Sequence, residues 1–144
     1  MNKQEIITRL KESNHRKIKV VVTDMDGVLR GKFMHVEKLI SALETGFGFC
    51  SVVFGWDMCD SAYDNTKMVG WHMGYGDFDA RLDLGSFRTI PWEEGTPFLI
   101  ADFSSEKAEN LPICPRSLLK NVIAKAENMG CAPMFSQEFE WFNF

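Results

Sequence analysis

Three groups of carboxylates carry the chemical possibilities of this sequence. Asp24 and Asp26 follow directly on the β-branched apolar run Lys17–Thr23. Glu138 and Glu140 lie two residues apart near the other end of the chain, among aromatic side chains. Further aspartates occupy the middle of the chain: Asp57, Asp60, Asp64, Asp77, Asp79 and Asp83. Carboxylates can attack phosphates, bind hard divalent cations or capture cationic amines, so their positions must decide among these chemistries.

The pair Asp24 and Asp26 is open to two interpretations. In the first, residues 17–23 form a buried strand of a parallel sheet, and the two aspartates at its end hold Mg²⁺ and attack a phosphate. An apolar strand followed by Asp-x-Asp-Gly is typical of haloacid-dehalogenase-type phosphatases. In the second, Asp26-Gly27 is the turn of a β-hairpin, and the basic segment Arg30-Gly-Lys32 lies on the returning strand.

The phosphatase interpretation lacks the context that its chemistry needs. Such an enzyme requires βαβ crossovers, and here no helix is predicted after the aspartates until residue 37. It also requires a late acidic pair of the form Gly-Asp-x-x-x-Asp. Gly76-Asp77 begins this pattern, but Arg81 stands where the second aspartate should be. A short motif without its structural context is weak, so the hairpin is favoured.

Glu138 and Glu140 would share one face of a strand, because side chains alternate along a strand. Two same-face carboxylates beside Phe139 and Trp141 are costly unless a cation compensates them, and divalent metals accept such oxygen ligands. The alternative is an exposed edge strand, with the glutamates in water and the aromatic side chains in a core. The residue pattern leaves both interpretations open.

Asp57 and Asp77 stand out among the central aspartates. Each follows an apolar or glycine-aromatic segment that would hold it in place, so either could bind ammonium or an amine. Asp57 directly precedes residues 58–78, which show no clear period, and Asp77 lies near the end of that stretch. A loop of that length in a compact domain is usually functional or disordered, and its aromatic content argues against disorder.

Periodicity and turn residues predict the elements that position these groups. We expect helices at 2–13, 37–44 and 115–129, with Gly46 and Gly130 at the ends of the last two. Residues 104–112 are polar and form the predicted linker. The expected strands are 17–23, 28–35, 49–54, 80–84, 87–90, 98–103 and 133–144.

Composition narrows the class of protein. A length of 144 residues with 45% hydrophobic side chains fits one domain, or one domain and a piece of another. A net charge of −4 gives no reason to expect nucleic acid as a partner. Apolar runs are too short to span a membrane, and the charged first residues contain no secretory signal. The four cysteines form no Cys-x-x-Cys pair, which predicts reduced thiols in a cytoplasmic protein without structural zinc.

Several segments, in order, resemble the glutamine synthetase family, and particularly its γ-glutamyl-amine ligase branch. The hairpin TDMDGVLRGK resembles that branch's Asp-x-x-Gly-x-x-Arg-Gly-Lys pattern, and QEFEWFNF resembles the family's Glu-x-Glu strand. The similarity also includes the segments MGYGDFDARLDLGSFRTIPW, FLIADF and CPRSLL. Each motif is moderately specific, and their common order and spacing make chance agreement improbable.

The resemblance implies an α+β fold. Residues 1–110 would form a β-grasp-like N-terminal domain, a mixed sheet packed on a helix. Residues 111–144 would form the first helix and strand of a catalytic domain, truncated at Phe144. In the family, ATP phosphorylates the γ-carboxylate of glutamate, and ammonia or an amine then displaces the phosphate.

The resemblance also implies roles for single residues. Glu138 and Glu140 would each bind one catalytic Mg²⁺ or Mn²⁺ ion. Asp57 would bind and deprotonate ammonium, with Asp77 as its acidic companion. Both would act across a subunit boundary in a ring-shaped homo-oligomer, because the family's N-terminal domain completes the neighbour's active site.

The sequence departs from the family at one of these places. The usual Phe-Asp-Gly-Ser-Ser around the ammonium aspartate is replaced by Gly55-Trp-Asp-Met-Cys59, which leaves ammonia and a bulkier amine both open. The family's ATP-binding and glutamate-binding segments lie beyond the matched region, so we expect no catalysis from this chain alone. The alternative is a non-catalytic glutamine synthetase-like protein with a structural or assembly role.

Overall fold

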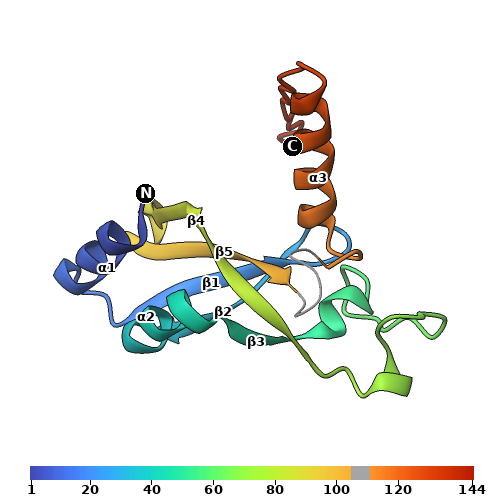
Figure 1. The fold of residues 1–144 in the computed structure, drawn as a ribbon, viewed down its shortest axis with the longest axis horizontal. Helices are drawn as coiled ribbons and strands as arrows, with labels where there is room; N and C mark the ends of the chain where they lie inside the picture. The colour runs from blue at the N-terminus through green and yellow to red at the C-terminus, as the bar shows by residue number, and fades with distance from the viewer. Residues whose placement is uncertain (105–110) are drawn as a thin grey trace.

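A five-stranded sheet runs through the protein, with three α-helices attached to it (Figure 1). This computed structural model describes residues 1–104 and 111–144. The α-helices are α1 (Lys3–Glu12), α2 (Val36–Thr45) and α3 (Pro115–Asn128). The strands are β1 (Lys17–Thr23), β2 (Leu29–His35), β3 (Phe47–Cys50), β4 (Asp77–Ile90) and β5 (Thr96–Ser104). Short 3₁₀ turns are η1 (Ser51–Phe54), η2 (Trp71–Met73) and η3 (Pro91–Glu93).

The sheet is mixed, with the strand order β2-β1-β5-β4-β3. Neighbouring strands are antiparallel except for the central pair, β1 and β5, which run parallel with Val20 opposite Leu99. Parallel neighbours need a crossover, and the chain between them supplies β2, α2, β3 and β4. This mixed sheet packed on helices confirms the predicted α+β class.

Strands β1 and β2 form an antiparallel hairpin, so the phosphatase interpretation of Asp24 and Asp26 is wrong. The Asp24 amide donates to the Val28 carbonyl at 3.0 Å, and the Gly27 amide donates to the Asp24 carbonyl at 3.2 Å. Gly27 has φ of 80°, the left-handed conformation that such a short hairpin turn requires. The next element after β1 is its antiparallel partner β2 and not a crossover helix, so the aspartates do not lie at the carboxyl edge of a doubly wound parallel sheet.

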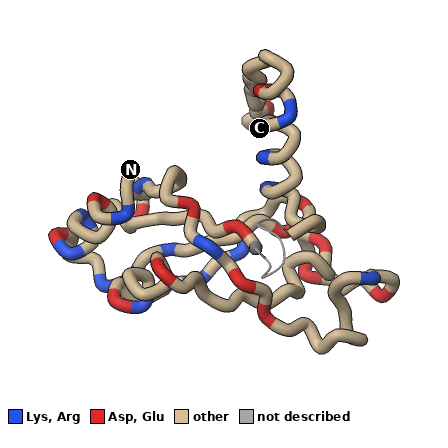
Figure 2. The backbone as a smooth tube through the Cα atoms, viewed as in Figure 1, with Lys and Arg blue, Asp and Glu red and all other residues tan. Residues whose placement is uncertain are grey.

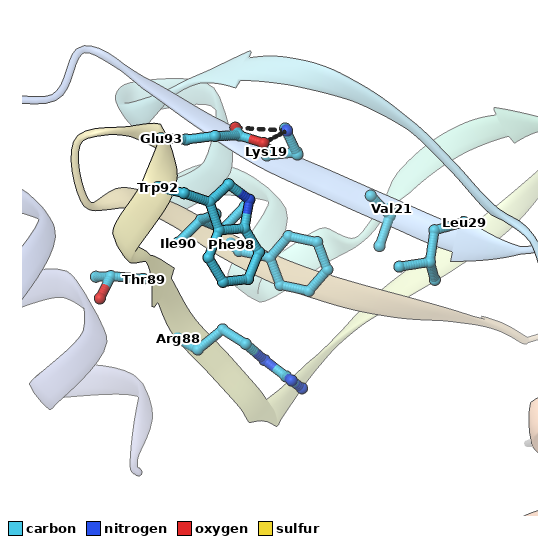
Figure 3. Close-up of a pocket in the computed structure, with 9 residues that line it drawn as sticks. All are labelled: Lys19, Val21, Leu29, Arg88, Thr89, Ile90, Trp92, Glu93 and Phe98. Carbon is cyan, nitrogen blue, oxygen red and sulfur yellow. Dashed lines mark hydrogen bonds and ion pairs between the residues drawn. The ribbon is translucent and has the colours of Figure 1, made fainter. Parts of the chain in front are cut away.

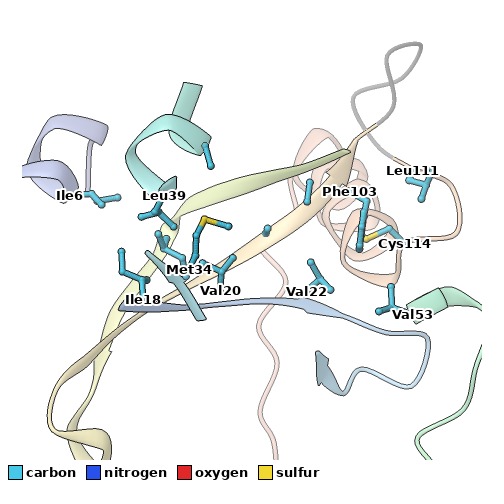
Figure 4. Close-up of a cluster of buried hydrophobic side chains, with 14 of the residues drawn as sticks. Ile6, Ile18, Val20, Val22, Met34, Leu39, Val53, Phe103, Leu111 and Cys114 are labelled. Carbon is cyan, nitrogen blue, oxygen red and sulfur yellow. The ribbon is translucent and has the colours of Figure 1, made fainter. Parts of the chain in front are cut away.

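One face of the sheet packs against α1 and α2 to form the main core (Figure 4). Ile6 and Leu10 are one helical turn apart and both are buried, as is Leu39 of α2. Burying each such side chain contributes about 1.5–3 kcal/mol, which docks the short helices on the sheet. Helix α1 begins with a capping box, in which Asn2 and Glu5 exchange hydrogen bonds with each other's backbone amides.

Two predicted strand boundaries are wrong. The apolar run 49–54 is a strand only to Cys50, and the 3₁₀ turn η1 then buries Val53 and Phe54. Apolar runs this short do not distinguish a strand from a buried turn. The predicted strands 80–84 and 87–90 are one continuous strand, β4, with a register shift between Asp83 and Arg88. The polar residues at this irregularity interrupted the alternation in the sequence.

The predicted final strand, 133–144, is also wrong. These residues form no helix or strand, and the aromatic side chains of Trp141 and Phe142 are 74% and 83% exposed. A strand needs a hydrogen-bonding neighbour, and no strand in the described part of the chain pairs with this segment. Most of the predicted linker, 105–110, lies outside the described residues. Its end is packed, since Leu111 is buried.

Helix α3 projects from one end of the sheet and is attached through charges at its first turns (Figure 1). Arg116 donates from Nε to Asp102 at 2.6 Å and also pairs with Asp83. Lys120 pairs with the same two aspartates. Desolvation of the Lys120 ammonium would lower its pKa, but its hydrogen bond to Asp102 and the nearby charges of Asp102 and Asp83 raise it. The apolar residues Leu118, Leu119 and Val122 of α3 stay exposed.

Gly31 of β2 has no room for a side chain. A Cβ at this position would lie 2.6 Å from Val21 Cγ1 and 2.7 Å from the Val20 carbonyl oxygen. We expect Gly31→Ala to lower the free energy of unfolding by about 1–3 kcal/mol, because the backbone of β1 must shift. Denaturant unfolding measures this. Gly76→Ala is the control, since nothing lies within 4 Å of its Cβ. Equal stability of the two variants would contradict the prediction.

Asp83 makes the attachment of α3 dependent on pH. Desolvation would raise the pKa of Asp83, but Lys120 and Arg116 outweigh it and lower the pKa below its ordinary value of 3.8. A carboxyl group whose pKa is lower when folded stabilises the protein above its unfolded pKa. That contribution is lost as the pH falls through the folded pKa.

We therefore expect the wild-type Tm to lose a contribution below about pH 4 that Asp83→Asn lacks at every pH. Thermal unfolding monitored by circular dichroism from pH 7 to acid measures the difference. Asp79→Asn is the control, because it also removes a carboxyl group from β4, but from a residue that is exposed. A Tm difference between wild type and Asp83→Asn that does not shrink in acid would refute this.

Candidate functional site

Asp24 is a fully buried carboxylate that is satisfied on both oxygens. Its Oδ1 accepts from the backbone amides of Asp26 at 3.0 Å and Val28 at 2.8 Å. Its Oδ2 accepts from Arg30 Nε at 2.7 Å. A buried charge is tolerated only when it is paired and hydrogen-bonded, and these three donors meet that condition. The role of Asp24 in this chain is to hold the hairpin turn and the Arg30 side chain.

The Arg30 guanidinium joins the hairpin to the segment that carries Asp57. While Nε binds Asp24, Nη1 contacts Asp60 Oδ1 at 2.5 Å, and Nη2 donates to the backbone carbonyl of Asp57 at 3.2 Å. Its central carbon lies 5.0 Å from the centroid of the Trp56 ring. The hydrogen bond to Asp24, and then that to Asp60, raise the pKa of Arg30 against the effect of desolvation.

Asp57 organises its own short loop and keeps one carboxylate oxygen available. Its Oδ1 accepts from the backbone amides of Cys59 at 2.8 Å and Ser61 at 2.9 Å. The Asp57 amide in turn donates to the Ser61 carbonyl at 3.0 Å. Oδ2 has no hydrogen-bond partner among the described residues. Asp57 is partly exposed, so this oxygen can accept from a cationic nucleophile that approaches from outside.

Aromatic side chains pack around the loop and give it a fixed shape. A Cβ on Gly55 would lie 2.7 Å from Tyr75 Cε1, so this position has space only for glycine. Tyr75 also meets Trp71 edge to face at 5.2 Å. Desolvation, and then the charges of Asp26 and Asp57, raise the pKa of the nearby Tyr63. These contacts fix the two ends of the loop, where Gly55 and Tyr75 meet, while most residues between 58 and 74 are exposed.

Asp77 lies elsewhere on the surface, at the start of β4 opposite Cys50 of β3. It lines an open pocket of about 420 Å³ whose other residues include Lys32, Lys38 and Gly48. A Cβ on Gly48 would lie 2.6 Å from Asp77 Oδ2, so glycine here makes room for the carboxylate. Within the described ranges, no hydrogen bond or salt bridge links Asp77 to Asp57. The structure does not join the two into one contact cluster.

Glu138 and Glu140 are exposed in the irregular final segment. Among residues 1–104 and 111–144, no group of three or more histidine, cysteine, aspartate or glutamate side chains is placed to hold a metal ion. Two carboxylates suit Mg²⁺ or Mn²⁺ chemically, since these ions prefer oxygen ligands. The remaining ligands would have to come from outside this set. Their role as metal ligands stays a prediction, as do the roles of Asp57 and Asp77.

The face of the sheet opposite the helices carries a further pocket that the sequence did not indicate (Figure 3). It encloses about 410 Å³ over the second, smaller apolar cluster, which includes Val21, Ile90 and Phe98. Lys19 and Glu93 form a salt bridge of 2.5 Å at its edge. Arg88 also lines the pocket, where its Nε donates to the Ser86 carbonyl at 3.1 Å and its guanidinium lies over the Phe98 ring.

Three general features of the described residues bear on the predictions made from composition: the distribution of charge, the length of apolar helices and the state of the cysteines. Basic and acidic residues are interspersed along the backbone (Figure 2). None of the helices that the structure describes is long and apolar enough to span a membrane. The four cysteines Cys50, Cys59, Cys114 and Cys131 are free thiols.

Comparison with known proteins identifies the relatives of this chain. No protein-family model matches the sequence. Type-1 glutamine synthetase 2 of Dictyostelium discoideum is 48% identical over 145 residues, which is 100% of this chain and 28% of that protein. Glutamate–isopropylamine ligase of a Pseudomonas species is 32% identical over 98% of this chain and 32% of its own length. By sequence, this chain belongs to the glutamine synthetase family.

The match covers only part of each relative. A γ-glutamylethanolamide synthetase of Streptomyces coelicolor is 32% identical over 84% of this chain and 26% of its own length. The chain thus spans between 26% and 32% of the length of these curated family members. The relatives include both glutamine synthetases and γ-glutamyl-amine ligases, which confirms the resemblance found in the motifs.

Solved structures of family members share the fold. A structure titled as a GmaS complex with ADP has a TM-score of 0.64 at 24% identity, over 85% of this chain and 25% of that one. Glutamine synthetase of Plasmodium falciparum has a TM-score of 0.64 at 18% identity, over 90% of this chain and 23% of that one. At these identities the likeness establishes the fold alone, and it agrees with the predicted α+β class.

Sequence reasoning missed the Asp24–Arg30 pair as part of the candidate site. It placed Asp24 at a strand end and Arg30 on the returning strand, without joining them. The register could have found the contact, because Arg30 pairs with Val22, two residues before Asp24 on the same face of β1. The contact from Arg30 to the Asp57 loop crosses 27 positions and left no local signal.

The buried Asp24 predicts a large stability effect. We expect Asp24→Ala to lower the free energy of unfolding by about 3 kcal/mol, because it removes three hydrogen bonds and leaves the partly buried Arg30 without its partner. Denaturant unfolding followed by tryptophan fluorescence measures this. The neighbouring exposed carboxylate is the control, and Asp26→Asn should stay within about 0.5 kcal/mol of wild type. If both variants lost a similar free energy of unfolding, the burial of Asp24 would not explain the loss.

Proposed function

We propose that this chain is the N-terminal portion of a glutamine synthetase-type ligase, which joins ammonia or an amine to the γ-carboxylate of glutamate through a γ-glutamyl phosphate. The observation that carries the proposal is the geometry of the loop around Asp57, the residue to which the family resemblance would assign nucleophile binding. Its loop is fixed by internal hydrogen bonds and by Arg30, while Oδ2 stays available. The family match along the whole chain supports the same conclusion.

The acidic residues of this chain would bind two kinds of cation, the nucleophile and the metal ions. Asp57 would bind the cationic form of the nucleophile and take its proton, with Asp77 as a second acidic group on the approach. Glu138 and Glu140 would each contribute oxygen ligands to a Mg²⁺ or Mn²⁺ ion. When bound, the metal ions and ATP supply the phosphoryl group and neutralise its charge.

The nucleophile is ammonia or a small amine. The relatives named above comprise a glutamine synthetase, an isopropylamine ligase and a γ-glutamylethanolamide synthetase, so the family accepts nucleophiles of different size. The segment Gly55–Cys59 presents Trp56 and Met58 beside Asp57. Met58 is 64% exposed, and an apolar side chain there suits an amine with a hydrocarbon group.

The organisation of the parent protein is part of the same proposal. We place the boundary between the β-grasp-like domain and the start of the catalytic domain near residue 110. The carboxylates would meet a neighbouring subunit in a ring-shaped homo-oligomer of a cytoplasmic enzyme. The chain alone should be inactive, because ATP and glutamate would bind to segments beyond this match.

A chimera tests the proposed function. This chain would replace the matching segment of the Dictyostelium relative, and glutamate-dependent formation of ADP would be measured with ammonia and with small amines. We expect the chimera to be active and the isolated chain to be inactive. Asp57→Asn in the chimera should reduce kcat/KM for the nucleophile by roughly 100-fold or more, the range for a lost general base.

Asp64→Asn is the matched control, because Asp64 is an exposed aspartate in the same long loop. It should leave kcat/KM within about twofold of the unmodified chimera. A folded chimera without activity toward any nucleophile would overturn the ligase proposal and favour the structural or assembly role. An active chimera that tolerates Asp57→Asn would refute the role of Asp57.

A further inference from the structure

Arg30 is a single side chain that fixes two parts of the chain at once. One edge of its guanidinium binds a buried carboxylate of the β1–β2 turn, and the rest faces the loop of Asp57. The two parts are far apart in the sequence, and the other hydrogen bonds of Asp57 stay within its own loop. The contact is therefore the polar link between the loop and the hairpin, beside the packing of Trp56 and Tyr75 against the main core.

Asp24 is held in place by its own burial and hydrogen bonds. Asp24 is 0% exposed, and its Oδ1 is held by two backbone amides of the turn. Its Oδ2 then fixes the direction of Arg30 Nε at 2.7 Å. A guanidinium is planar, so fixing Nε at one end of the group also fixes where Nη1 and Nη2 point.

At the loop end, both terminal nitrogens of the guanidinium make contacts. Nη2 donates to the carbonyl of Asp57 itself, Nη1 pairs with Asp60, and the plane lies beside the Trp56 ring. Asp60 has φ of 64°, a left-handed conformation that a non-glycine residue rarely adopts without support. Its amide donates to the Asp57 carbonyl at 3.1 Å, and its side chain pairs with Arg30.

We propose that Arg30 is a positioning residue for the nucleophile-binding carboxylate, holding the Asp57 loop against the β1–β2 hairpin so that Oδ2 faces the incoming amine. The inference rests on the proposed function and adds a residue to it. Asp24 is the anchor of this arrangement, and Asp60 and Trp56 are the contacts that orient the loop. Arg30 itself touches neither substrate nor metal.

Lysine cannot replace arginine in this arrangement. An ammonium group can keep the charge opposite Asp24, but it is a compact point charge without the planar fork that reaches Asp57, Asp60 and Trp56 together. Arg30→Lys should therefore stay folded while the loop loses its attachment. Displacements of about 1 Å in a reacting group can cost 100-fold in rate, so even a small shift would be measurable.

The first experiment measures the loop in the full chain of 144 residues. Hydrogen exchange by NMR would follow the amides of Cys59 and Ser61, which donate to Asp57 Oδ1. We expect Arg30→Lys to accelerate the exchange of both amides by about tenfold or more, with the core amide of Leu99 unchanged. Arg88→Lys is the matched control, because Arg88 lies over Phe98 on the other face of the sheet.

The second experiment measures the chimera described above. Arg30→Lys should raise KM for the amine by roughly 10- to 100-fold, while KM for glutamate and for ATP stays unchanged. Arg88→Lys should leave all three values unchanged. A loss of stability alone would lower the amount of active enzyme without separating the amine from the other substrates.

Each result decides one question. Faster loop exchange together with a selective rise in the KM of the amine supports the proposal. Unchanged exchange at Cys59 and Ser61 overturns it, and so does an unchanged KM in an active chimera whose loop has loosened. If the chimera is inactive with Arg30 intact, the proposed function fails instead, and the exchange data alone decide whether Arg30 orders the loop.

Discussion

The constraint on which this chain depends is the burial of one carboxylate. Asp24 has no access to solvent, so its charge must be met by the turn amides and by Arg30. This requirement fixes the β1–β2 turn, which begins the sheet, and it fixes the arginine that contacts the loop of Asp57. A stability requirement at the start of the fold thus becomes a requirement on the geometry of the candidate site.

Much of the fold could be predicted from the sequence, because its signals are local. The β-branched run of β1, Gly27 in the turn, the apolar face of α2 and Pro115 at the start of α3 each act within a few residues. The wrong strand predictions also have physical reasons. Val53 and Phe54 are apolar because η1 is packed into the core, not because they form a strand. The final segment has a strand pattern, but within the described chain it has no neighbour to pair with.

The candidate site could be predicted only in part. Asp57 was found because it follows an apolar run and precedes a loop, and family resemblance gave it a role. What holds it was not found, because the contact from Arg30 and the packing of Tyr75 on Gly55 join segments separated in sequence. The position of Asp77 could not be predicted either, because it depends on the pairing of β4 with β3, in which Asp77 lies opposite Cys50.

The way α3 is attached has a geometric consequence. The helix has 14 residues and is therefore about 21 Å long, yet its charged contacts with the sheet lie in its first two turns. Arg116 and Lys120 therefore hold the helix to the sheet near one end. A tilt of about 10° at Arg116 would move the far end of the helix, about 18 Å away, by roughly 3 Å. The segment with Glu138 and Glu140 follows the far end of this helix, so the place where that segment starts depends on the contacts of Arg116 and Lys120.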